Sequence, residues 1–246
     1  MRRLLFVLLF ALLAPAPARP DDATDLRDRV IKAHAKDPAD LKKFRVHTVK
    51  ATGIFRPGAD QVPATFEMAG VYPGRMKLTW EFGTGAMKTT ATLCGADDQG
   101  WRKGSNFTAQ DLTVEEVNDF RADAYAIWVA TLITLDDKET TLSPAGRTRA
   151  GPSPLVGLKV ARRPWPEVTL WFDEKTGLLR KMAYKSREAG ATLNKEMTYD
   201  GHKEASGLMV PTKHTVSIQG RPVYNWEGME YSFPDRIDPG VFAKPK

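Results

Sequence analysis

The strongest constraint on the fold is a long series of short segments with a period of two, separated by turn residues. The clearest segment is 75–82, where Met76, Leu78, Trp80 and Phe82 alternate with polar side chains. Successive residues of a strand point to opposite faces, so this segment predicts a sheet with one apolar and one wet face. Similar segments are predicted at 44–55, 63–72, 86–94, 100–103, 139–142, 155–161, 167–173, 178–186, 192–199, 208–218 and 223–233.

Two helical segments interrupt the strands. Residues 21–43 carry apolar side chains at helical spacing, and residues 113–133 open with Thr113-Val-Glu-Glu116, a capping-box pattern. About eleven strands joined mostly by tight turns indicate a continuous antiparallel meander, and so many strands in one sheet must curl. We therefore expect a mainly β (α+β) fold: a strongly curved antiparallel sheet, or incomplete β-barrel, with helices plugging its concave face.

The N-terminus has the pattern of a secretory signal peptide. Arg2 and Arg3 precede an apolar run from Leu4 to Leu13, and small residues follow up to Ala18. We expect residues 1–18 to be the signal peptide and residues 19–246 to form a single domain; an uncleaved N-terminal anchor is the alternative. No cysteine follows the apolar run, so lipid anchoring is not expected and the location is periplasmic or secreted, without a transmembrane segment after cleavage.

Composition bounds the classes of function. The formal net charge of +6 is spread along the chain without a basic block, so nucleic acid is not an expected partner. The single cysteine, Cys94, cannot form an internal disulfide, and its place in a strand favours a buried structural thiol. The histidines His34, His47, His202 and His214 show no metal-ligand spacing, and no G-x-S-x-G motif occurs.

These patterns predict no catalytic residues, no metal site and no cofactor, and hence a protein that is not an enzyme. An enzyme stays open as an alternative, in which His47 or His214 would meet a serine in an open cleft. The apolar side of the sheet, rich in tryptophan and methionine, instead suggests either a filled core or a cavity for an acyl chain. The residues expected to line such a cavity are Met76, Leu78, Trp80, Trp101, Trp128, Phe172 and Met182.

Four segments carry a resemblance to a known family: 128–132 (WVATL), 170–179 (LWFDEKTGLL), 199–211 (YDGHKEASGLMVP) and 237–243 (IDPGVFA). Together with 72–78 and 100–101, they resemble the secreted bacterial proteins related to outer-membrane lipoprotein-sorting proteins, the LolA-like superfamily. The resemblance implies a curved half-barrel that binds a lipid or an acylated lipoprotein without covalent chemistry.

This chain differs from the carrier itself at one position. The carrier has an arginine just before the proline of this segment, whereas here Tyr72 precedes Pro73. This difference motivates an alternative function, an envelope stress sensor or protein-interaction module on the same fold with an envelope protein as partner. In either case we expect a monomer.

Overall fold

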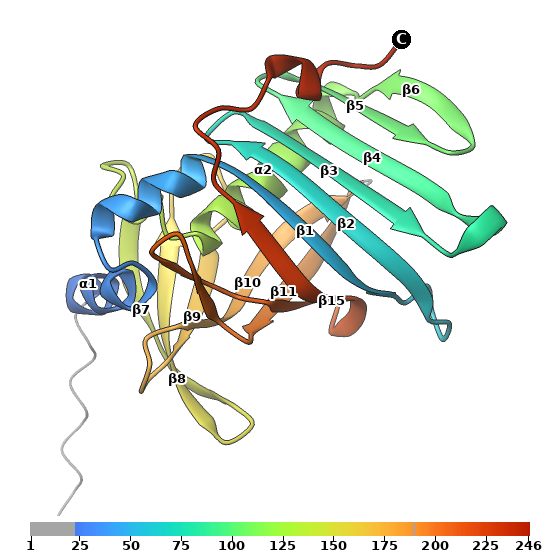
Figure 1. The fold of residues 1–246 in the computed structure, drawn as a ribbon. Coiled ribbons are helices and arrows are strands. Elements are labelled where there is room, and N and C mark those ends of the chain that lie inside the picture. The colour runs from blue at the N-terminus through green and yellow to red at the C-terminus, as the bar shows by residue number, and fades with distance from the viewer. Residues whose placement is uncertain (1–22, 189) are drawn as a thin grey trace, which may run out of the picture.

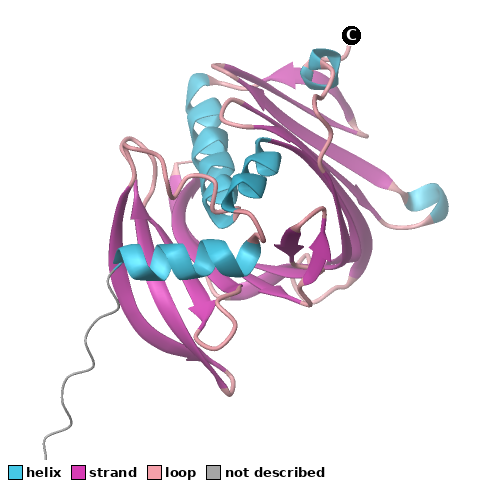
Figure 2. Cartoon of the chain, turned by 60° about the vertical axis from the view of Figure 1, so that its left-hand side comes forward, coloured by secondary structure: helices cyan, strands magenta, loops and turns pink. Residues whose placement is uncertain are grey.

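The computed structural model describes residues 23–188 and 190–246, so the signal peptide expected at residues 1–18 lies outside the described residues. The chain forms one large curved antiparallel sheet of thirteen strands, with helices on its concave side (Figures 1 and 2). Its strand order is β6-β5-β4-β3-β2-β1-β15-β14-β11-β10-β9-β8-β7. The sheet ends at β6 and β7 without closing on itself, which confirms the expected incomplete barrel.

The sheet consists of two successive meanders, and β14 and β15 lie between them in the strand order. The first meander comprises β1 (Val46–Phe55), β2 (Val62–Val71), β3 (Arg75–Phe82), β4 (Thr89–Ala96), β5 (Gln99–Gly104) and β6 (Phe107–Asp111). The second comprises β7 (Thr141–Ala150), β8 (Ser153–Ala161), β9 (Val168–Asp173), β10 (Leu179–Glu188) and β11 (Ala191–Asp200), and is followed by β14 (Lys213–Ile218) and β15 (Arg221–Ser232). A separate hairpin pairs β12 (Lys203–Ala205) with β13 (Leu208–Val210).

The helical elements are α1 (Ala23–His34), α2 (Val114–Ala130) and three short 3-10 turns, η1 (Pro38–Arg45), η2 (Gly85–Met87) and η3 (Pro239–Phe242). The single helix expected over 21–43 was wrong, because the chain leaves α1 at His34 and begins η1 after Asp37. Proline disfavours helical geometry in the residue before it, so Pro38 ends one element and starts the next. The Asp37 side chain accepts the N–H of Ala39 and caps the new turn.

The strand expected over 208–218 is likewise divided, into β13 and β14. Pro211 lies at the break, and because proline has no N–H to donate to a ladder, pairing stops there. The predicted capping box is confirmed: the Thr113 hydroxyl accepts the Glu116 N–H, and the Glu116 carboxylate accepts the Thr113 N–H.

Helix α2 lies in the concavity of the sheet and divides the apolar interior into two clusters (Figure 2). On one side, Tyr125, Ala126 and Val129 pack with α1 and with β8, β9 and β10. On the other side, Phe120 and Ala124 face the first meander and β15. No helix in the described part of the chain is long and apolar enough to cross a membrane.

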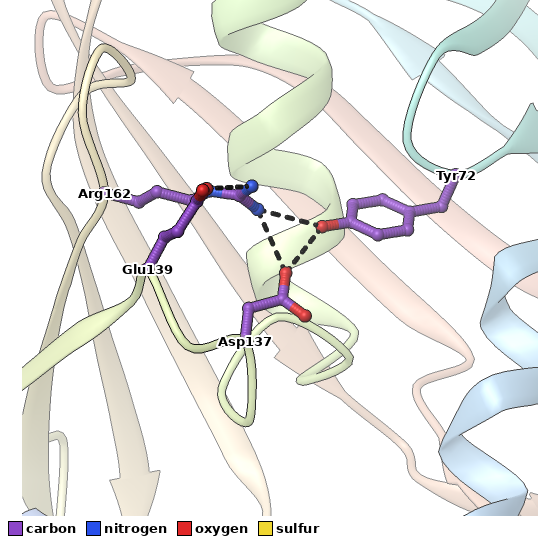
Figure 3. A network of polar contacts seen from close by, with 4 residues as sticks. All are labelled: Tyr72, Asp137, Glu139 and Arg162. Atoms are coloured by element: carbon purple, nitrogen blue, oxygen red, sulfur yellow. Dashed lines mark hydrogen bonds and ion pairs between the residues drawn. The ribbon is translucent and has the colours of Figure 1, made fainter.

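A polar network connects the two meanders beside α2 (Figure 3). The Tyr72 hydroxyl, just after β2, donates to the Asp137 carboxylate at 2.8 Å, and the Arg162 guanidinium, just after β8, donates to the same carboxylate at 3.0 Å. Arg162 also donates to Glu139 at 2.6 Å. Partial burial, together with the hydrogen bond to Asp137, raises the pKa of Tyr72. The network therefore ties the β2–β3 turn to the loop that follows α2 and to the end of β8.

Candidate functional site

The concave face holds a cavity of about 600 Å³ between α2 and the strands. That volume falls in the range of roughly 300–1,000 Å³ usual for ligand pockets. Helix α2 contributes Phe120, Ala124 and Ile127 to its wall. The strands contribute a continuous apolar lining: Val49, Phe66, Met68, Met76, Leu78, Trp80, Leu93, Met197, Val216, Ile218, Trp226 and Met229.

Three of the expected site residues, Met76, Leu78 and Trp80, line this cavity together. They lie on β3 at intervals of two, so the alternation that predicted the strand also gives them one face. Met76 is buried, while Leu78 and Trp80 are partly exposed toward the cavity.

Trp128, Phe172 and Met182 do not line the cavity, and their expected place in its wall is corrected. Phe172 and Met182 are fully buried in the cluster formed with α1 and α2, and Trp128 is buried on α2 itself. The physical reason is that both helices pack onto β8, β9 and β10, so this part of the concave face is already filled. These residues belong to the packed core beside the cavity.

Trp101 is on the opposite, convex face, so its expected place in the cavity is also corrected. Strand register decides this: Trp101 pairs with Cys94, and Cys94 pairs with Lys77, whose side chain lies on the face away from Met76 and Leu78. Its indole N–H donates to the carbonyl of Phe242 at 2.9 Å, beneath the C-terminal turn η3. Cys94 is buried in the same cluster, and burial raises the pKa of its thiol to about 11.

One end of the cavity is charged. Where α2 approaches the β10–β11 hairpin, the Lys195 ammonium contacts the Asp123 carboxylate at 2.6 Å and the Glu188 carboxylate at 3.9 Å. Nearby, Arg102 contacts Glu116 at 2.8 Å. Acidic and basic groups alternate at this end, so opposite charges offset one another at the cavity's edge.

The other end is lined by uncharged polar side chains, and sequence reasoning missed it. All four histidines of the chain line the cavity, with Tyr199 and Tyr231 beside them. Burial is the main cause that lowers the pKa of each histidine to about 4, so all four are neutral at pH 7. His47 could have been assigned to this wall from its sequence, because it lies two residues before the inward-facing Val49.

The cavity is lined mainly by apolar side chains, with histidine, tyrosine and charged side chains among them. Its lining residues in the described part of the chain include no serine. Among the same described residues, no group of three histidine, cysteine or acidic side chains is placed to hold a metal ion.

Comparison with solved structures identifies the fold. A LolA superfamily protein from Nitrosomonas europaea has a TM-score of 0.53 and 12% identity, over 91% of this chain and 98% of that one. A structure described as an outer membrane lipoprotein-sorting protein domain, from Vibrio parahaemolyticus, has a TM-score of 0.53 and 11% identity, over 89% and 97%. A DUF1329 family protein from Desulfovibrio piger has a TM-score of 0.54 and 11% identity, over 91% and 98%.

No protein-family model and no curated protein sequence matches the chain. At identities of 11–12%, the structural likeness concerns the fold alone. The chain has the LolA-like fold, as the resemblance of its sequence implied.

Proposed function

From a LolA-like fold with an open apolar cavity, we propose that this chain is an exported carrier, periplasmic or secreted, that binds the acyl chain of a lipid or of an acylated lipoprotein. The observation that carries the proposal is the cavity of about 600 Å³, whose strand wall is made of methionine, aliphatic and aromatic side chains. Methionine suits such a wall because its flexible thioether adapts to chains of varied shape. Residues 19–246 would form the mature carrier.

The energetics fit an acyl chain. Each buried methylene contributes about 0.8 kcal/mol, so twelve methylenes would contribute roughly 10 kcal/mol before the cost of association, which is estimated at about 4 kcal/mol or more. The remainder corresponds to binding in the micromolar range or weaker, which suits a carrier that must also release its cargo. The fold similarity to a lipoprotein-sorting protein domain supports the same class of cargo.

Two neighbouring residues of β3 offer a matched test. Leu78 lines the cavity, whereas Thr79 is on the convex face, where it pairs with the exposed Glu67. Leu78→Gln would place an amide without a partner against a bound acyl chain, at a cost of about 1–3 kcal/mol. Binding of a fluorescent fatty acid should weaken at least five-fold in Leu78→Gln and stay unchanged in Thr79→Gln.

Equal binding by both variants and by the unaltered protein would place the ligand elsewhere and overturn the cavity as the site. If the unaltered protein binds no acyl ligand but retains a specific protein partner after delipidation, the chain is an interaction module rather than a carrier.

A further inference from the structure

The histidine end of the cavity contains polar atoms that the fold itself does not use. The Nε2 atoms of His202 and His214 are buried and have no hydrogen-bond partner among the described residues. Both side chains line the cavity. A buried polar atom without a partner is costly, so native structures rarely leave one unless a ligand, ion or water completes it.

In each of the other two histidines, the backbone satisfies at least one ring nitrogen. The His34 ring donates from Nδ1 to the Val30 carbonyl at 2.8 Å and accepts the Leu179 N–H at Nε2, at 3.1 Å. His47 donates from Nδ1 to the Phe44 carbonyl at 2.8 Å. A neutral imidazole that donates from one nitrogen carries a lone pair on the other, so the Nε2 atom of His47 is an acceptor.

These groups gather at one end of the barrel. His34 ends α1, His202 precedes β12, and the two rings are 6.2 Å apart. The His214 ring on β14 stacks on Tyr199 of β11 at 4.9 Å. The Tyr199 hydroxyl is directed to the sulfur of Met197 at 3.7 Å, so it leaves the His214 nitrogen unsatisfied.

The charges around this end offset one another. His202 lies near Arg180 and Asp200, which form an ion pair of 2.9 Å on β10 and β11. Burial alone lowers the pKa of His214, and His47 is affected by burial and by its carbonyl partner. This end thus offers uncharged imidazole nitrogens, in contrast to the ion pairs of Lys195 at the opposite end.

We propose that His47, His202 and His214 form a subsite for an uncharged, hydroxyl-bearing head of the acyl-chain ligand. The inference rests on the proposed carrier function and narrows its cargo: a fatty alcohol or acylglycerol hydroxyl is preferred to a carboxylate or phosphate of the same chain length. A hydroxyl can both donate to the Nε2 lone pair of His47 and accept from an imidazole N–H. An anion would lose its hydration here, and the nearby cation, Arg180, is already paired with Asp200.

The test compares three probes with the purified full-length mature chain: a neutral naphthylamine dye, which reports the apolar cavity, hexadecanol and palmitate. Hexadecanol should displace the dye at a concentration at least ten-fold below that needed for palmitate at pH 7. His214→Phe keeps an aromatic ring but removes both nitrogens. Because His214 lines the cavity, a slight change in dye binding is expected, but binding of hexadecanol should weaken at least five-fold more than binding of the dye. His202→Phe provides the same test if the His214 variant does not fold.

Nitrogen-15 spectra of the histidine rings give a readout that a change in packing would not reproduce. Hexadecanol should shift the Nε2 resonances of His47, His202 and His214, while His34, with both nitrogens already bonded, serves as the internal control. Dye binding without preference for the alcohol, or with shifts absent from these three rings, would overturn the subsite and leave the carrier function standing. Failure to bind any of the three probes would overturn both.

Discussion

Two leucines differ in packing, because one lines the cavity and the other lies in the packed core. Leu170 on β9 is fully buried, paired with Leu158 and Met182 on the adjacent strands and covered by the helices. Leu78 on β3 is partly exposed and faces the cavity of about 600 Å³. The same substitution, leucine to alanine, should therefore have different consequences at the two positions.

Leu170→Ala removes buried methyl groups and leaves a void among side chains that cannot close around it. Such changes cost about 2–5 kcal/mol. A loss of about 3 kcal/mol corresponds to a decrease in Tm of roughly 6–12 °C for a chain of this size. Leu78→Ala only enlarges a space that is already open, so we expect a loss below about 1.5 kcal/mol, from reduced contact with its wall neighbours.

Urea and thermal unfolding followed by circular dichroism would measure both variants against the unaltered protein. The same samples should show the reverse order in acyl binding, with Leu78→Ala altered and Leu170→Ala unchanged at temperatures where it is folded. Equal losses of stability at both positions would contradict this expectation, because they would mean that the cavity wall is packed in solution as tightly as the core.

Three further results are expected. Tyr72→Phe removes the hydroxyl that donates to Asp137 and should cost about 1 kcal/mol and speed hydrogen exchange in the loop after α2; unchanged exchange would show that the network does not hold that loop. Trp101→Phe loses the bond to the Phe242 carbonyl and should loosen the C-terminal turn without affecting acyl binding, whereas weakened binding would return Trp101 to the cavity. The histidines have pKa values of about 4 in the folded state and about 6.5 when unfolded, so the unfolded chain binds more protons between these values. Stability should fall as pH decreases from about 6.5 to about 4, by on the order of 2 kcal/mol at pH 5 for each of the buried His34 and His47 and by less for the partly exposed His202 and His214. Urea midpoints that are flat over this range would contradict the burial of these side chains.

The sequence predicts the fold where a segment has one apolar face. Strand β3 is predicted with its observed bounds, Arg75–Phe82, because its alternation is complete. The two edge strands were the hardest to predict: β6 was not expected, and β7 extends to Ala150 rather than ending at residue 142. Both are largely exposed, and since an edge strand needs no buried face, its sequence carries no alternation to detect.

The candidate site depends on facts that no single segment contains. The alternation within β5 does not determine which face of the sheet Trp101 lies on, because that face depends on the pairing of Trp101 with Cys94 on β4. Phe172 and Met182 do face the concave side, but helices from elsewhere in the chain cover them. The proposed histidine subsite combines the start of β1 with His202 and His214 from two later segments, so only the folded chain brings it together.

Whether the cavity carries an acyl-chain ligand can be measured from the native mass of the protein purified without detergent from the cells that make it. We expect a fraction of molecules heavier than the mature chain by one ligand, which collisional activation releases and which organic extraction identifies as acyl-bearing. This fraction should be reduced in Leu78→Gln and retained in Thr79→Gln. A bare protein mass in every preparation, together with no binding of a fluorescent fatty acid, would contradict the claim.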